Sequence, residues 1–252
     1  MFPLGSSHLA SLASKEKKPQ YCKRKMDSLP LEILNLIIRA GDHTQKKAPF
    51  AALSKTWQAA IERYTFARLY VQTHELADFK RILSSENRRA ALGFLRWRVN
   101  LPPYRRDEDG EAEPETADEQ AENDAIFTRG IVDLLSVMKA WEEEMPGLKM
   151  AKMLELDISA EARSPELVGW GFDAVNSNRF SGSLLHLRID NPLPTLERPV
   201  SFQTDDFCLR NIKGESVVMI ACGFKNLIEL HIQLFDGEKV DSELRQQQRY
   251  GQ

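Results

Sequence analysis

The sequence predicts an α+β protein in which a short N-terminal group of helices precedes an irregular region of helices and strands. Three observations favour this class. Apolar residues recur every three to four positions between residues 29 and 83, which is the period of amphipathic helices. In four later segments apolar and polar residues alternate, as is typical of half-buried strands. The 252 residues are enough for one large or two small domains.

The first helix is predicted to begin near Leu29. Pro30 fits the first turn, where its missing N–H costs nothing, and Glu32 lies near the positive end of the helix dipole. Gly41 is a natural stop. The apolar face of this helix is formed by Ile33, Leu34, Ile37 and Ile38.

Two more helices are predicted from the same period. One runs from about Pro49 into the sixties, and its apolar face is Phe50, Leu53, Trp57 and Ile61. The other begins near Thr73, and its apolar face is Leu76, Phe79, Ile82 and Leu83. A later helix follows from about residue 126, with a buried stripe of Ile126, Phe127, Ile131, Leu134, Leu135 and Met138.

Strands are predicted from alternation. Residues 95–101 place Leu95, Trp97, Val99 and Leu101 on one face. Three further copies read apolar-x-Leu-x-Ile, namely Leu154–Ile158, Leu185–Ile189 and Ile228–Ile232. Long connections favour parallel pairing, so we expect these three copies to be neighbouring strands of one parallel sheet, with their connections on one side. The uneven spacing predicts an irregular, leucine-rich-repeat-like region, and an ordinary α+β domain is the alternative.

Changes in composition divide the chain into six segments. They are a basic, disordered tail at 1–25, a helical module at 26–72, a linker helix and first strand at 73–106, an acidic disordered loop at 107–124, an irregular αβ region at 125–240 and a polar tail at 241–252. The acidic loop is predicted because that stretch has no basic residue and too few apolar ones to order itself. The basic tail is either a nuclear import signal or a solvated leader.

Composition excludes several classes of function. Apolar residues make up 42% of the chain and charged residues 28%, the balance of an ordinary globular protein. The net charge of -3 gives no general attraction to nucleic acid or to an anionic membrane. No apolar run approaches the roughly 20 residues that span a bilayer, and the start lacks the charge order of a secretory signal. We therefore expect a cytoplasmic or nuclear protein.

Cysteines and histidines indicate neither a disulfide framework nor a metal site. The three cysteines (Cys22, Cys208 and Cys222) are far apart in the sequence, and none belongs to a CxxC pair. The five histidines supply no HxxxH pair. Because a structural zinc ion needs four such ligands close together, we expect reduced cysteines, no metal ion and no cofactor.

Two motifs of the helical module resemble those of an F-box. The first is Leu29-Pro30-Leu31-Glu32-Ile33-Leu34, followed by Ile37 and Ile38, and the second is Leu53-Ser54-Lys55-Thr56-Trp57, followed by Ile61. An F-box opens with Leu-Pro-x-Glu-Ile/Leu and later carries a hydrophobic-Ser-Lys-x-Trp motif, at about the distance found here. Further along, Leu101-Pro102-Pro103-Tyr104 and the acidic stretch after it resemble a family of F-box proteins from filamentous fungi. The likeness covers the first half of the chain well and the second half loosely.

This resemblance implies a role in ubiquitin conjugation. The N-terminal helices would bind the adaptor subunit of an SCF-type ubiquitin ligase, and the αβ region would bind a target protein. The adaptor-binding residues would be Leu29, Pro30, Leu31, Ile33, Leu34, Ile37, Ile38, Leu53, Trp57 and Ile61. Independently of the resemblance, a module of this size cannot bury so many apolar side chains alone, and an exposed apolar cluster marks a protein–protein site. Neither nucleic acid nor membrane is an expected partner.

The sequence does not predict an enzyme. Gly214-Glu215-Ser216 resembles the start of a nucleophile elbow, but Val218 stands where the second glycine is required. Gly169-Trp170-Gly171 lacks the rest of a dinucleotide fingerprint. The alternative to a ubiquitin-ligase subunit is a non-catalytic, solenoid-like scaffold whose N-terminal helices only cap its repeats.

Overall fold

The computed structural model describes residues 29–40, 47–103, 113–144, 153–162, 183–204 and 210–232. The predicted tails at 1–25 and 241–252, the first part of the acidic loop, and Cys22 and Cys208 lie outside the described residues. The chain divides into two compact units at Ile61 and Glu62. We call them the N-terminal unit and the sheet unit, and each is described by itself.

The N-terminal unit contains the first predicted helix, but the single helix predicted from about Pro49 into the sixties is divided in two by the turn at residues 52–54. The helices are α1 (Leu31–Ala40), α2 (Ala48–Ala51) and α3 (Lys55–Thr65), the last of which runs across the division of the chain. The carbonyl of Pro30 accepts the first hydrogen bonds of α1, from the amides of Ile33 and Leu34 at 3.0 and 3.1 Å. Ser54 starts α3, because its Oγ accepts a hydrogen bond from the amide of Trp57 at 3.3 Å.

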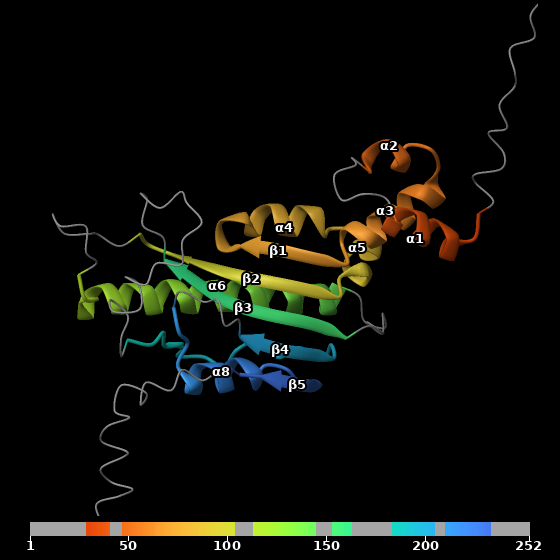
Figure 1. Ribbon diagram of the computed structural model, residues 1–252. Helices are drawn as coiled ribbons and strands as arrows, with labels where there is room; N and C mark the ends of the chain where they lie inside the picture. Colours follow the sequence, from red (N-terminus) through yellow and green to blue (C-terminus); the bar gives the residue numbers. More distant parts are fainter. Residues whose placement is uncertain are drawn as a thin grey trace, which may run out of the picture. The chain divides into compact units, whose positions relative to one another are not determined.

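The sheet unit is built on five parallel strands whose order follows the chain (Figure 1). They are β1 (Arg68–Gln72), β2 (Phe94–Leu101), β3 (Leu154–Ala162), β4 (Val200–Thr204) and β5 (Leu227–His231). The strands predicted at residues 95–101, 154–158 and 228–232 correspond to β2, β3 and β5, and the expected parallel arrangement in one sheet is confirmed. The copies at 154–158 and 228–232 are not neighbours, because β4 lies between β3 and β5. The strands β1 and β4 were not predicted, and β1 takes into the sheet five residues that the sequence assigned to the N-terminal module.

The prediction of a strand at Leu185–Ile189 is wrong. Leu185 forms only an isolated bridge with Ile212. The reason lies in the partners of the next amides, which are side chains rather than a neighbouring strand. The amide of His186 donates to Asp124, that of Leu187 to Ser216 and that of Arg188 to Thr128, at 2.8 to 2.9 Å. A segment whose amides bind side chains cannot also form a strand ladder.

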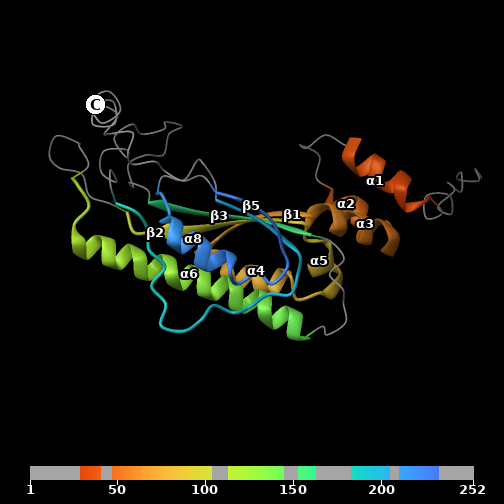
Figure 2. The ribbon, with the colours of Figure 1, turned by 90° about the horizontal axis from the view of Figure 1, so that it is seen from below.

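The helices of the sheet unit lie on one side of the sheet (Figure 2). They are the 3-10 turn η1 (Thr73–Glu75) and the helices α4 (Leu76–Ile82), α5 (Glu86–Ala91), α6 (Ala117–Glu144) and α8 (Gly214–Ala221). Because consecutive parallel strands are neighbours and crossovers share one hand, the described helices that connect them fall on the same face. The fold is therefore mixed α/β with a parallel five-stranded sheet, and the described residues form seven α-helices in all.

The core lies between this sheet and α6. Trp97 and Val99 of β2 are fully buried, as are Phe127, Ile131 and Leu134 of α6. Gly130 lets the helix approach closely, since a Cβ there would lie 3.0 Å from a methyl of Thr73 and 3.1 Å from one of Val99.

The predicted acidic loop is shorter than expected, because α6 begins at Ala117 rather than after residue 124. A capping box explains the start of the helix. Thr116 Oγ1 accepts from the amide of Glu119 at 3.2 Å, and a Glu119 carboxylate oxygen accepts from the amide of Thr116 at 2.9 Å. Residues 117–124 are therefore helical despite their acidic composition, and the prediction of disorder there is wrong.

Candidate functional site

The structure separates the predicted adaptor-binding residues into an exposed and a buried group. Pro30, Ile33, Ile37 and Leu53 are exposed, and Leu29 is half-buried. The buried group consists of Leu34, Ile38, Trp57 and Ile61. Leu31 lies in α1, but its side chain lies outside what is described. Among the predicted residues whose side chains are described, only the exposed group and Leu29 can contact a partner without unfolding.

Helix α1 is apolar on two adjacent faces. Leu34 and Ile38, one turn apart, are 0% and 5% exposed. The residues just before them, Ile33 and Ile37, are also one turn apart but are 40% and 44% exposed. Neighbouring positions on a helix differ by about 100°, so one pair packs inward while the other faces solvent. An amphipathic surface helix ordinarily carries polar side chains at the second set of positions.

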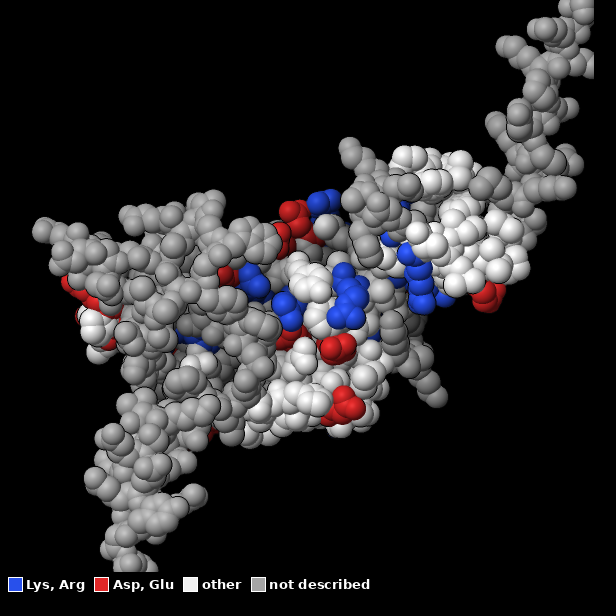
Figure 3. Space-filling view, in the orientation of Figure 1, with Lys and Arg blue, Asp and Glu red and all other residues white. Residues whose placement is uncertain are grey.

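Two exposed apolar residues were missing from the predicted site. Leu36 is 61% exposed and lies three residues after Ile33, so it extends the outer face of α1. Phe50 of α2 is 40% exposed while its ring stacks on that of Trp57, with centroids 5.9 Å apart. The signal for Leu36 was its spacing from Ile33. We call Ile33, Leu36, Ile37, Phe50 and Leu53 the apolar surface of the N-terminal unit. On the side seen in Figure 3, the described part of this unit is mostly uncharged.

The sheet unit presents a very different surface on the side of the sheet away from the helices. Figure 3 looks onto this open face, where basic side chains gather over the first strands and acidic ones lie beside them. Arg96 Nε donates to Asp157 Oδ2 at 2.7 Å, and Arg98 Nη1 donates to Glu161 Oε2 at 2.8 Å. Arg96 lies directly opposite Asp157 in the sheet, whereas Arg98 lies opposite Ser159, two residues before Glu161. Cross-strand pairs of opposite charge stabilise the sheet.

On the same open face, arginine guanidinium groups stack on aromatic rings. The guanidinium of Arg68 lies over the ring of Phe94 at 4.2 Å, and that of Arg96 lies over the ring of Tyr70 at 5.6 Å. Tyr70 itself is 63% exposed. Exposed tyrosine and arginine side chains held in place by stacking are typical of protein-binding surfaces.

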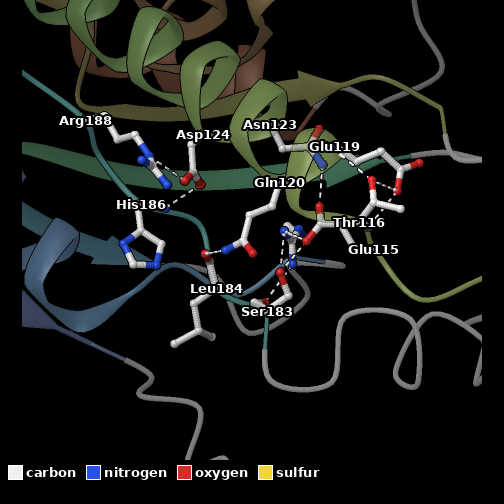
Figure 4. A network of polar contacts seen from close by, with 11 residues as sticks. Glu115, Thr116, Glu119, Gln120, Asn123, Asp124, Ser183, Leu184, His186 and Arg188 are labelled. Carbon is white, nitrogen blue, oxygen red and sulfur yellow. Dashed lines mark hydrogen bonds and ion pairs between the residues drawn. The ribbon is translucent and has the colours of Figure 1, made fainter.

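A polar network fastens the start of α6 to the segments at 183–190 and 210 (Figure 4). Arg210 and Glu115 form an ion pair whose side chains are 0% and 1% exposed, and Ser183 hydrogen bonds to the same carboxylate. Asn123 Nδ2 donates to Glu115 at 2.6 Å. Asp124, also fully buried, accepts from Arg188 Nε at 2.8 Å in addition to the amide of His186. Because its members bind one another, we assign this network to the architecture and not to a ligand.

The C-terminal end of α6 is also held by an ion pair and by hydrogen bonds to a carboxylate. Glu144 accepts from Arg89 at 2.6 Å, across one end of an open groove of about 540 Å³ between α4 and α6. The carboxylate of Glu142 accepts from the amides of Glu197 and Arg198 at 2.9 to 3.0 Å. The guanidinium of Arg198 donates to the carbonyl of Leu92, and burial lowers the pKa of this arginine to about 10.

The serine of the elbow-like motif lies in the interior of the sheet unit. Ser216, the serine of the elbow-like motif, is 3% exposed, and its Oγ accepts the amide of Leu187 at 2.8 Å. Its hydroxyl is therefore part of the packing of α8. The described residues contain no cluster of three or more metal-ligating side chains. Nor, within the same residues, is any helix both long and apolar enough to cross a membrane.

Comparisons of the chain with protein-family models, with curated proteins and with solved structures give no match. Function is therefore inferred from the two surfaces described above, the apolar surface of the N-terminal unit and the charged open face of the sheet.

Proposed function

We propose that this chain is a substrate-receptor subunit of an SCF-type ubiquitin ligase. In this proposal the N-terminal unit is an F-box module that binds the adaptor subunit. The sheet unit, an irregular leucine-rich-repeat-like region, binds a target protein. The chain itself does no chemistry. By holding a target lysine near a conjugating enzyme, it raises the effective concentration of that lysine.

One observation carries this proposal, namely the outer face of α1. Ile33, Leu36 and Ile37 are each at least 40% exposed on a helix whose other apolar face is already buried. Fully burying one such side chain contributes roughly 1.5–3 kcal/mol, so three of them are enough to anchor a complex. Ile33, Ile37 and Leu53 belong to the two F-box-like motifs, which is why an adaptor is the partner that we propose.

The open face of the sheet is the surface that we propose for the target. It combines the exposed Tyr70 with Arg68 and Arg96 in stacked arrangements, and Arg96 is paired with the buried Asp157 of β3. Mixed charge and exposed aromatic surface favour a folded or extended protein partner over nucleic acid, which would select for an uninterrupted basic surface.

Titration of the full-length chain with purified adaptor tests the proposal. We expect the wild-type chain to bind. Replacing Ile33 and Ile37 together by alanine keeps the helix and removes the outer apolar side chains, so we expect the Kd to rise by at least about thirtyfold, equivalent to roughly 2 kcal/mol. The double substitution Leu29→Ala and Pro30→Ala, at the edge of the same surface, should weaken binding in the same direction.

The matched control is the double substitution of Val218 and Met219 by alanine. These residues are 52% and 37% exposed on α8 of the sheet unit, so the same apolar area is lost elsewhere and the Kd should not change. Absence of adaptor binding by the wild-type chain, or equal affinity of the α1 double variant, would favour the non-catalytic scaffold instead.

A further inference from the structure

The charged side chains of the open face are paired in one row of the sheet and unpaired in the row before it. In the paired row, Arg96 lies opposite Asp157, and their side chains form the ion pair described above. In the preceding row, Arg68 of β1 lies opposite Phe94 of β2, which in turn lies opposite Glu155 of β3. In the described part of the chain, neither the guanidinium of Arg68 nor the carboxylate of Glu155 has an ion pair or a hydrogen bond. This row therefore carries opposite charges that are not neutralised by each other.

The guanidinium of Arg68 is held in place by an aromatic ring. Arg68 is exposed, and its guanidinium carbon lies 4.2 Å from the centroid of the Phe94 ring. The Phe94 ring also packs against Tyr70, with centroids 5.6 Å apart. The contact with the ring uses none of the guanidinium N–H groups in a conventional hydrogen bond, so they remain donors for a planar anion such as a carboxylate. Because the side chain is already positioned, binding an anion there costs less side-chain entropy.

The other end of the same row is acidic. Glu155 is half-buried and lies opposite Ser201 of β4, and Ser201 lies opposite Glu229 of β5. Ser201 Oγ donates to Glu229 at 3.1 Å. The side chain of Glu229 is 55% exposed and lies 3.6 Å from His231, which is charged only when it is protonated. The two carboxylates therefore attract a cation to this end of the row.

The spacing of the strands sets the distance between the two ends. Arg68 and Glu155 are two strands apart, which corresponds to about 10 Å. In an extended chain of polyproline II type, residues three positions apart lie on the same side and about 9 Å apart. An extended segment that runs across the strands can therefore place an acidic side chain at Arg68 and a basic one at Glu155. Figure 3 shows that basic side chains and acidic side chains lie beside one another on this face.

We propose that the row from Arg68 to Glu229 recognises an extended segment of the target protein that carries an acidic and a basic residue three positions apart. The acidic residue binds Arg68, and the basic residue binds Glu155 and Glu229. An apolar side chain of the segment packs on Tyr70, which is 63% exposed. A carboxylate fits Arg68 better than a phosphate does, because the doubly charged phosphate is repelled more strongly by the carboxylates of the same row. This inference rests on the proposed role of the open face in binding the target, and adds the chemistry of that target.

Selection from a displayed library of random 12-residue peptides on the immobilised full-length chain tests this site. We expect the retained peptides to be enriched in an acidic and a basic residue three positions apart. Fluorescence anisotropy of one such synthetic peptide then gives its Kd. Arg68→Glu should raise this Kd by at least about tenfold, since it replaces an attraction by a repulsion. The same variant should retain peptides that are basic at both positions, and Glu155→Lys should retain peptides with more acidic residues.

The matched control is Arg81→Glu, which makes the same change of charge on α4, at a side chain that is 72% exposed. It should alter neither the Kd nor the retained peptides. A wild type that retains no peptide with this charge pattern, or an effect of Arg81→Glu equal to that of Arg68→Glu, would overturn the proposal. Tighter binding of a phosphoserine version of the peptide than of its glutamate version would overturn the preference for a carboxylate. The selection uses no adaptor, so its failure is distinct from a failure of the adaptor titration.

Discussion

The N-terminal unit leaves apolar side chains at its surface, whereas the sheet unit takes charged side chains into its interior. In the first, Ile33, Leu36 and Ile37 face solvent. In the second, Asp124 and Arg210 are fully buried. The buried charges are held by partners within the same unit, so they require nothing from outside. The outer apolar face of α1 is exposed although the inner face of the same helix is buried, and this difference is the reason why we place the proposed adaptor site on α1.

The largest effect is expected inside the N-terminal unit. Trp57 is 2% exposed, so Trp57→Ala should lower the free energy of unfolding of this unit by about 3–5 kcal/mol. Leu36→Ala, at a position 61% exposed, should lower it by less than about 0.5 kcal/mol. Amide hydrogen exchange in α1 and α3 reports this unit alone. Similar losses for the two variants would mean that the outer face of α1 is part of a core.

A smaller effect is expected for a buried charge of the sheet unit. Asp124→Ala leaves the amide of His186 and the guanidinium of Arg188 without their acceptor, and we expect a loss of about 1.5–3 kcal/mol in urea unfolding. Asp78 is the control, because its ion pair with Arg81 at 2.8 Å is exposed. Asp78→Ala should cost no more than about 1 kcal/mol. Equal effects would show that the network around α6 adds nothing to stability.

The smallest effect is expected for an exposed ion pair. The hydrogen bond and the charge of Lys225 lower the pKa of the Glu197 carboxyl below its ordinary value of 4.5. The resulting stabilisation is present above that ordinary value and is lost as the pH falls through the lower, folded pKa. Glu197→Gln should therefore lower the melting temperature slightly at neutral pH. The difference should vanish in strong acid and shrink in high salt; a difference that grew in acid would contradict this assignment.

The sequence predicted elements whose periodicity reflects burial on one face. In β2 from Leu95 onward and in β3, apolar and polar residues alternate in the sequence, and α6 carries its apolar stripe at helical spacing, so the dominant signal was local. Strand β4 was missed because it is short, with Val200 and Phe202 as its only apolar residues, which are too few to define a period. The segment at Leu185 has the alternation of a strand but gives its amides to side chains of α6 and α8. Because these partners are distant in the sequence, the hydrogen bonds to them cannot be predicted from the periodicity of the segment itself.

The candidate surface was predictable in part for the same reason. The apolar positions of α1 were identified from their spacing, but spacing alone did not separate Ile33 from Leu34. Which of two adjacent apolar faces turns inward depends on the packing of the unit, and Trp57, expected at an exposed surface, is instead buried. The start of α6 at Ala117 could have been predicted from the sequence, because Thr116 and Glu119 have the spacing of a capping box within the acidic segment.

The length of α6 has a mechanical consequence for the sheet that it covers. Its 28 residues span about 42 Å, whereas the eight residues of β2 span only about 26 Å. The helix must therefore overhang the sheet, and its terminal turns cannot be held by apolar contacts with the strands. Both overhangs carry ion pairs instead, Glu115 with Arg210 before the first turn and Glu144 with Arg89 at the last. A helix fixed by ion pairs at both ends in this way has its terminal turns fastened to the sheet unit although they extend past the strands.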